Sequence, residues 1–102
     1  MALTGYPKEF RSTNIHSVKN SAGDGSKDVG DVMAGDNTYF KVKAMSTASA
    51  DYADIKVRYT GGGTVETLRV FAGQSLDGPY AEVEVDAISS ANLSVLVYYQ
   101  SI

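Results

Sequence analysis

The chain has 102 residues, and its 9 Lys and Arg residues against 12 Asp and Glu residues give a formal net charge of −3. A chain of this length makes one domain, because independent domains run from about 50 to 250 residues. Hydrophobic residues at 43% and charged residues at 21% exclude global disorder. The acidic balance argues against nucleic acid as the main partner, since phosphate binding needs clustered positive charge.

The sequence contains no cysteine, which excludes disulfides and thiolate metal sites. The opening "MALTGYPKEF" lacks the apolar region of a signal peptide, and no run approaches the roughly 18 apolar residues of a membrane span. We therefore expect a protein made in the cytoplasm that binds neither a membrane nor a cofactor.

In the first residues of the chain, apolar and polar residues do not alternate regularly. Residues 1–9 contain Gly5 and Pro7 without alternation, which predicts an extended N-terminal arm before a single domain at residues 10–102. Two weak strand candidates follow, "STNIHSVK" and "DVGDVMA". The glycine- and aspartate-rich stretches around them read as turns.

Stronger strand signals follow, because apolar and polar residues then alternate with a period of two, which is typical of half-buried antiparallel strands. In "TYFKVKAM", Phe40, Val42 and Ala44 share one face and Tyr39 takes the other. No window shows the spacing of an amphipathic helix. The predicted strands are 38–45, 54–60, 64–72, 80–87 and 92–100.

Glycine-rich breaks separate these runs. Gly61, Gly62 and Gly63 predict a hairpin, since glycine supplies the positive φ that such loops need. The stretch 72–79, "AGQSLDGP", predicts a connecting turn. The whole pattern predicts an all-β fold: an antiparallel β-sandwich or a jelly-roll-like small barrel of about seven or eight short strands.

The sequence contains three candidates for a catalytic or phosphate-binding site, and each lacks a feature that its chemistry needs. A phosphate-cradling loop at 72–79 would need a helix after it, but a strand pattern follows. A nucleophilic Ser75 would need a base, and the chain has one histidine, His16, which we interpret as a surface polar residue. Glu82 and Glu84 have a spacing that suits a glycosidase pair, but we interpret them as solvent-facing acids. We therefore predict that the protein is not an enzyme.

A calcium site is an open alternative. Asp24, Asp28 and Asp31 lie in one glycine-rich loop, and calcium prefers oxygen ligands in flexible loops. The spacing does not fit an EF-hand, which favours a solvated turn. Lys41, Lys43, Lys56 and Arg58 form the nearest thing to a basic patch, and alternation places them on an outer face.

The tyrosines favour a protein-binding surface. Alternation assigns Tyr39, Tyr80 and Tyr98 to faces opposite their strands' apolar residues, and exposed aromatic patches are uncommon on free monomers. The β-prone C-terminal run is either a central strand or an edge that docks on another copy. The predicted interface residues are Tyr6, Phe10, Tyr39, Tyr80, Leu96, Tyr98 and Ile102.

The stretch "FAGQSLDGPYAEVEV…NLSVLVYYQSI" resembles the C-terminal part of small bacteriophage virion proteins. Gly73, Gln74 and Gly78 match their glycine-led turn, and Leu93 to Tyr99 match their final β-run. The first 18 residues resemble the arm that leads into their first strand. The resemblance implies a β-rich structural component of the particle that works as a multimer and has no catalytic residue.

The resulting hypothesis is a virion structural protein, first of all a capsid decoration (cement) protein. Its partners would be other copies of itself and a major capsid or other virion protein whose lattice it stabilises. The resemblance suggests a trimer, because trimers are common among decoration proteins of this kind. A tail or head–tail connector subunit is the second choice. A carbohydrate- or receptor-binding β-module is the alternative from another class, because tyrosine platforms also bind sugars.

Overall fold

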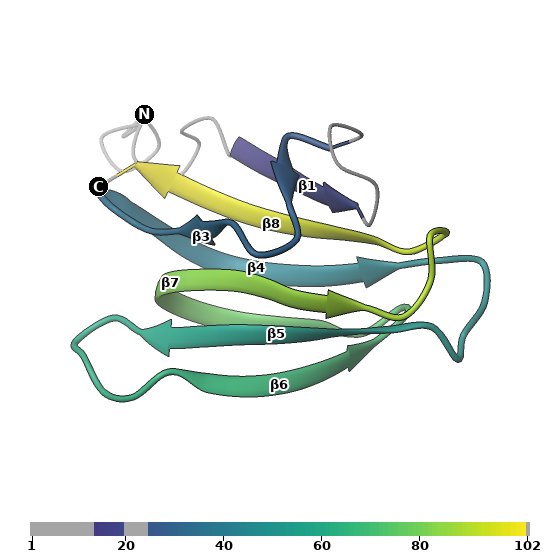
Figure 1. Ribbon diagram of the computed structural model, residues 1–102. Coiled ribbons are helices and arrows are strands. Elements are labelled where there is room, and N and C mark those ends of the chain that lie inside the picture. The colour runs from purple at the N-terminus through teal and green to yellow at the C-terminus, as the bar shows by residue number, and fades with distance from the viewer. Residues whose placement is uncertain (1–13, 20–24, 102) are drawn as a thin grey trace, which may run out of the picture.

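A computed structural model describes residues 14–19 and 25–101 (Figure 1). The predicted arm, residues 1–9, lies outside the described residues. No described helix is long and apolar enough to cross a membrane. The described residues form eight strands: β1 (Asn14–Lys19), β2 (Lys27–Asp28), β3 (Val32–Met33), β4 (Asn37–Met45), β5 (Tyr52–Tyr59), β6 (Glu66–Phe71), β7 (Ser75–Ile88) and β8 (Ser94–Ser101).

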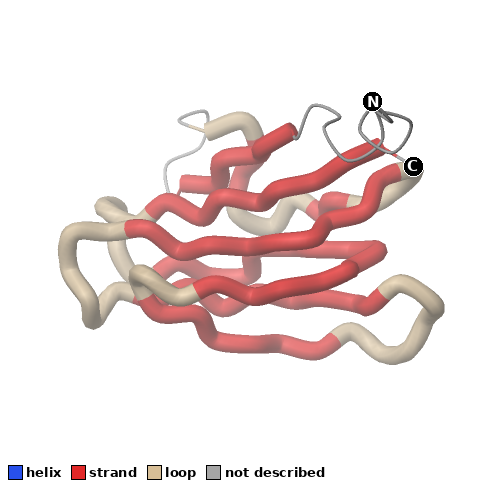
Figure 2. Tube along the Cα trace, turned by 180° about the vertical axis from the view of Figure 1, so that it is seen from behind, coloured by secondary structure: helices blue, strands red, loops and turns tan. Residues whose placement is uncertain are grey.

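The strands belong to a single hydrogen-bonded sheet with the order β2-β1-β8-β4-β7-β5-β6, and β3 pairs with β7 beside this path. All pairs are antiparallel except the short parallel pair of β1 and β2. The sheet curls so that its inner face encloses the core, and loops gather at both ends of the strands (Figures 1 and 2). The all-β prediction is confirmed, with one curled sheet in place of the two separate sheets of a sandwich.

The curl depends on a bend within β7 (Figure 1). The first half of this strand pairs with β4, and the second half, from Tyr80 onward, pairs with β5. The ladder with β5 skips Ala81 and Asp86, so β7 carries an extra residue at each of these points. Such bulges bend a strand and increase its twist. One long strand therefore serves both sides of the core.

The prediction of a turn over 72–79 is wrong for most of its length. Ser75, Leu76 and Asp77 pair with β4, so only the stretch before Ser75 turns the chain. Gly73 has a φ of 89° there, and its N–H donates to the Ala44 carbonyl at 2.8 Å. Pairing with β4 outweighs the low strand propensity of this segment, since propensity is a weak prior against tertiary context.

The predicted hairpin at the glycine run is confirmed. β5 and β6 are antiparallel neighbours, and the loop between them contains Gly61, Gly62 and Gly63, all with φ near +100°. Side chains other than glycine rarely adopt this left-handed conformation. The positive φ values of this loop therefore explain why three glycines occur there in succession.

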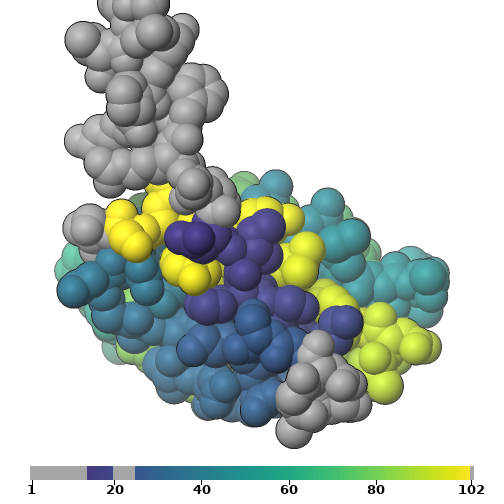
Figure 3. Space-filling view, turned by 90° about the horizontal axis from the view of Figure 1, so that it is seen from above, coloured from purple at the N-terminus to yellow at the C-terminus, as the bar shows by residue number. Residues whose placement is uncertain are grey.

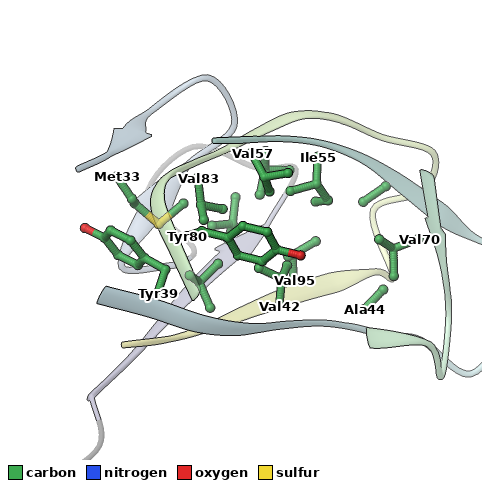
Figure 4. Packing of buried hydrophobic residues seen from close by; sticks show 14 of the residues in the cluster. Met33, Tyr39, Val42, Ala44, Ile55, Val57, Val70, Tyr80, Val83 and Val95 are labelled. Atoms are coloured by element: carbon green, nitrogen blue, oxygen red, sulfur yellow. The ribbon is translucent and has the colours of Figure 1, made fainter. Parts of the chain in front are cut away.

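The core fills the space between the two sides of the curled sheet. In Figure 4, Val42 and Ala44 approach from β4, while Ile55 and Val57 approach from β5. The buried residues are Val18, Met33, Tyr39, Val42, Ala44, Ala53, Ile55, Val57, Val70, Tyr80, Val83, Val85, Leu93, Val95 and Val97.

The prediction that Tyr39 and Tyr80 lie on outer faces is wrong, because each side chain is only 1% exposed. The ladder between β4 and β8 gives β4 an extra residue after Tyr39, and the extra Ala81 follows Tyr80. Each tyrosine is therefore on the same face as the apolar residue three positions later, Val42 or Val83. The bulges reverse the alternation on which the prediction depended.

Both buried tyrosines keep a partner for their polar ends. The Tyr39 hydroxyl donates to the Ala34 carbonyl at 3.1 Å and accepts from the Asn37 amide Nδ2 at 3.4 Å. The Tyr80 side chain is hydrogen-bonded with that of Tyr59, and the two rings lie 5.0 Å apart. Burial, and secondly the neighbouring Tyr59, raises the pKa of Tyr80 to about 12. Tyrosine is tolerated in a core when its hydroxyl is bonded in this way.

Candidate functional site

The described part of the chain contains no pocket, and no three His, Cys, Asp or Glu residues within it are grouped so that they could hold a metal ion. Candidate sites among these residues are therefore surfaces. Asp24 of the possible calcium loop lies outside the described residues. The Asp31 carboxylate accepts the Asp28 N–H at 2.9 Å, and the Asp31 N–H donates to the Asp28 carbonyl at 3.1 Å, as in a local turn.

His16 lies on β1, half-buried, and packs flat against an aromatic ring. Its ring centroid is 4.4 Å from that of Tyr99, with 18° between the planes. Partial burial, and secondly the nearby Lys27, lowers the pKa of His16 below its usual value. The neutral imidazole therefore acts as an aromatic packing partner between β1 and β8.

The outer face of β5, β6 and the second half of β7 is charged. The Arg69 guanidinium donates to both Asp54 carboxylate oxygens, at 2.9 and 3.2 Å. This hydrogen bonding lowers the pKa of Asp54. Two further pairs bridge β5 and β7, Lys56–Asp86 at 3.5 Å and Arg58–Glu82 at 3.4 Å. The outward placement predicted for Lys56, Arg58 and Glu82 is correct, and their charges are paired within the chain.

Two aromatic side chains, Tyr52 and Phe71, lie beside Arg69 on this charged face. The Arg69 guanidinium carbon lies 3.8 Å from the centre of the Tyr52 ring, and Tyr52 meets Phe71 edge-on with centroids 5.7 Å apart. Cation–π and edge-to-face contacts each add modest stability at an exposed site. Arg69 is therefore held from two sides, by a carboxylate and by a ring.

The outer face of β1, β8 and β4 has a different chemistry. Ile15, Tyr98 and Lys41 stand opposite one another across the three strands, and Leu96 stands opposite Lys43 in the next row. Directly opposed side chains in a sheet lie about 5 Å apart, so these rows form one continuous surface. We call it the basic–aromatic face, and it consists of Ile15, Phe40, Lys41, Lys43, Leu96 and Tyr98.

Apolar side chains on this face are open to solvent. Ile15 is 50% exposed, and Leu96 and Tyr98 are half-buried. The Phe40 ring lies 6.3 Å from the Tyr98 ring. Seen from above, side chains of β1 and β8 lie together at the surface (Figure 3). Exposed aromatic and aliphatic side chains that adjoin one another are typical of an interaction surface.

The lysines of this face differ from the cations of the charged face. Lys41 and Lys43 make no ion pair with any acid in the described residues, whereas Lys56, Arg58 and Arg69 each have one. A lysine without an internal partner keeps its charge for a ligand or partner surface. The basic–aromatic face therefore combines apolar area with unneutralised positive charge.

The predicted interface residues have three outcomes. Leu96 and Tyr98 lie on the basic–aromatic face, Tyr39 and Tyr80 lie in the core, and the others are outside the described residues: Tyr6, Phe10 and Ile102.

Sequence reasoning missed two residues of this face. Ile15 could have been found from its spacing, because it lies three residues from Val18 and cannot share a strand face with it. Phe40 was assigned to the inner face, and its outward position depends on the bulge in β4.

The fold and surface together define a small all-β protein whose exposed chemistry lies on sheet faces. No family model matches the sequence, and comparisons with curated proteins and with solved structures gave no match either.

Proposed function

We propose that this protein is a non-enzymatic structural component of a virus particle, working as a homo-oligomer that binds and stabilises the capsid lattice. A tail or head–tail connector subunit is the second form of the same proposal. The virion context comes from the resemblance of the turn at Gly73 and of the final β-run to small phage virion proteins.

The observation that carries the binding role is the basic–aromatic face. Burial of Leu96, Tyr98 and Ile15 against a partner would supply the hydrophobic driving force, at about 25 cal/mol for each Å² removed from water. Lys41 and Lys43 would add orientation and a faster encounter with an acidic surface.

Purified particles of the virus that encodes the chain provide the test. We expect mass spectrometry to find the chain among the particle proteins, and added wild-type protein to sediment with particles that lack it. Leu96→Asp should lose this co-sedimentation, because it places a charge in the apolar centre of the face. Thr67→Asp, on the exposed charged face, is the matched control and should still bind. A chain missing from the particles would refute the proposal.

A carbohydrate-binding module is the second candidate, and the half-buried Tyr98–Phe40 pair on the outer face favours it, since aromatic side chains make platforms for sugar rings. Reproducible glycan-array binding that is lost in Tyr98→Ala would support this alternative. Tyr80→Ala is not a useful probe, because Tyr80 is buried.

A further inference from the structure

Strand β6 forms an open end of the sheet. It is last in the strand order, pairs only with β5 among the described residues, and makes the lower border of the molecule in Figure 1. At the other end of the described sheet, β2 has only two residues, whereas β6 has six. A strand of this length with one free side can pair with a further strand.

The hydrogen bonds at the end of β6 identify the backbone groups on its free side. The Ala72 N–H donates to the Asp51 carbonyl at 2.9 Å, beside β5, whereas the Phe71 N–H donates at 3.1 Å to a side-chain oxygen of the turn toward β7. Because these directions alternate along a strand, the N–H and C=O groups of Thr67 and Arg69 point away from β5. No described residue forms a backbone ladder with them.

Strand β6 lacks the features that usually protect an edge. It contains no proline or lysine, and its ladder with β5 runs without a bulge. Of its two charged residues, Arg69 is bound by Asp54 of the same molecule at 2.9 Å, and Glu66 lies at the first position of the strand. Two apolar side chains near its ends are open to solvent, Val65 at 47% and Phe71 at 40%. The edge therefore combines free backbone groups with exposed apolar area.

One antiparallel register makes this edge complementary to itself. When Leu68 stands opposite Leu68 of a second copy on a two-fold axis, Thr67 of each copy stands opposite Arg69 of the other. These are the residues with outward backbone groups, so the two opposed pairs form four hydrogen bonds. The same register places exposed Val65 of each copy opposite exposed Phe71 of the other. Core-facing and outer residues also stay on matching sides of the joined sheet.

We propose that two copies of the chain pair antiparallel through β6 and form one continuous sheet across a two-fold axis. Because both copies use the same patch, the contact is isologous and closes at a dimer. This inference deepens the homo-oligomer part of the proposed function and rests on it. The basic–aromatic face lies on β1, β8 and β4, so it stays available for another protein.

The self-match favours a second copy over an unrelated extended segment. Any strand could bond to the free backbone groups of this edge. Val65 and Phe71, however, meet across the contact only when the same sequence returns in the opposite direction. The apolar area at both ends of the edge is therefore covered by one occupant.

The first test introduces a single cysteine, which reports the register because the chain has none of its own. In the proposed dimer Leu68 opposes Leu68 in a non-hydrogen-bonded pair, where Cα atoms lie about 4.5 Å apart and a disulfide fits. We expect the full-chain variant Leu68→Cys to form a disulfide-linked dimer on a non-reducing gel after mild oxidation. Val65→Cys is the matched control. Its thiols would lie about 20 Å apart in the dimer, so it should crosslink more slowly although Val65 is the more exposed residue.

The second test measures mass in solution by light scattering. Wild type should have twice the mass of the monomer. Val65→Asp should halve this mass, because it places a charge opposite Phe71. Thr67→Asp places the same charge on the same edge but opposite Arg69, so it should remain dimeric. Val32→Asp, at a valine of similar exposure on β3, should also remain dimeric.

A proline variant tests the backbone pairing itself. Thr67→Pro removes an N–H that β5 does not use, so it should be monomeric with an unchanged circular dichroism spectrum. A monomeric wild type, equal crosslinking of Leu68→Cys and Val65→Cys, or loss of the dimer in Thr67→Asp would each overturn the proposal. A wild-type oligomer that survives Val65→Asp would overturn this contact and leave the homo-oligomer part of the proposed function standing. Absence of the chain from particles is a separate result, because these tests use the purified chain.

Discussion

Tyr39 of β4 and Tyr80 of β7 stand directly opposite each other in the sheet, and both side chains are buried. The β-ladder slips by one residue immediately beside this pair. The bulge at Ala81 follows Tyr80 directly, at the point where the pairing partner of β7 changes from β4 to β5. The two tyrosines therefore fill the core at the point where the sheet bends.

The burial of Tyr39 predicts a large cost for removing its ring. We expect Tyr39→Ala to lower the free energy of unfolding by about 4 kcal/mol, the usual range for a buried aromatic. Tyr39→Phe should cost about 1 kcal/mol, through the lost hydrogen bond to Ala34. Tyr98→Ala, at a half-buried outer position, should cost about 1 kcal/mol. Urea denaturation measures all three, and equal losses for the two alanine variants would contradict this assignment.

The close approach of backbone at Gly78 predicts that no side chain fits there. A Cβ at this position would lie 2.5 Å from the Tyr39 carbonyl oxygen and 2.6 Å from the Tyr80 nitrogen. Gly78→Ala should therefore cost about 3 kcal/mol, because backbone must move. Gly62→Ala is the control, since a Cβ there meets open space and only the positive φ is penalised, by about 1 kcal/mol. The melting temperatures of the two variants test this difference. Equal decreases in melting temperature would argue against close backbone contacts at Gly78.

The lowered pKa of His16 predicts a pH-dependent stability in the near-neutral range. The unfolded state binds the proton more readily than the folded state, so the free energy of unfolding falls as the pH drops below about 6.5. His16→Phe keeps an aromatic ring against Tyr99 and removes the titration. Urea midpoints between about pH 7.5 and pH 5.5 should decline more steeply in wild type than in this variant. Parallel declines would show that His16 does not contribute.

The raised pKa of Tyr80 predicts destabilisation in alkali. Above about pH 10 an unfolded tyrosine loses its proton, whereas Tyr80 in the folded protein keeps it up to about pH 12. The folded state then holds more protons than the unfolded state, so stability decreases as the pH rises. Tyr80→Phe should reduce this decrease, as measured by thermal unfolding between pH 9 and pH 11. An unchanged slope would remove Tyr80 as its source.

The sequence by itself determined the class of fold and the location of most strands. The alternation in residues 54–60 and 92–100 predicted β5 and β8, and the glycine run predicted the hairpin between β5 and β6, because side-chain period and positive φ are local properties. In a strand without a bulge, such as β8, the alternation also predicted correctly which residues face outward, as for Leu96 and Tyr98.

Only the tertiary structure decided where the alternation breaks. Bulges at Phe40 and Ala81 move Tyr39 and Tyr80 inward and Phe40 outward, and pairing with β4 makes a strand of the glycine- and proline-containing stretch from Ser75. A bulge is a difference in residue number between two paired strands, so one strand's sequence does not contain it. The contrast between a self-paired charged face and an unneutralised basic–aromatic face has the same origin, because it depends on which strands become neighbours.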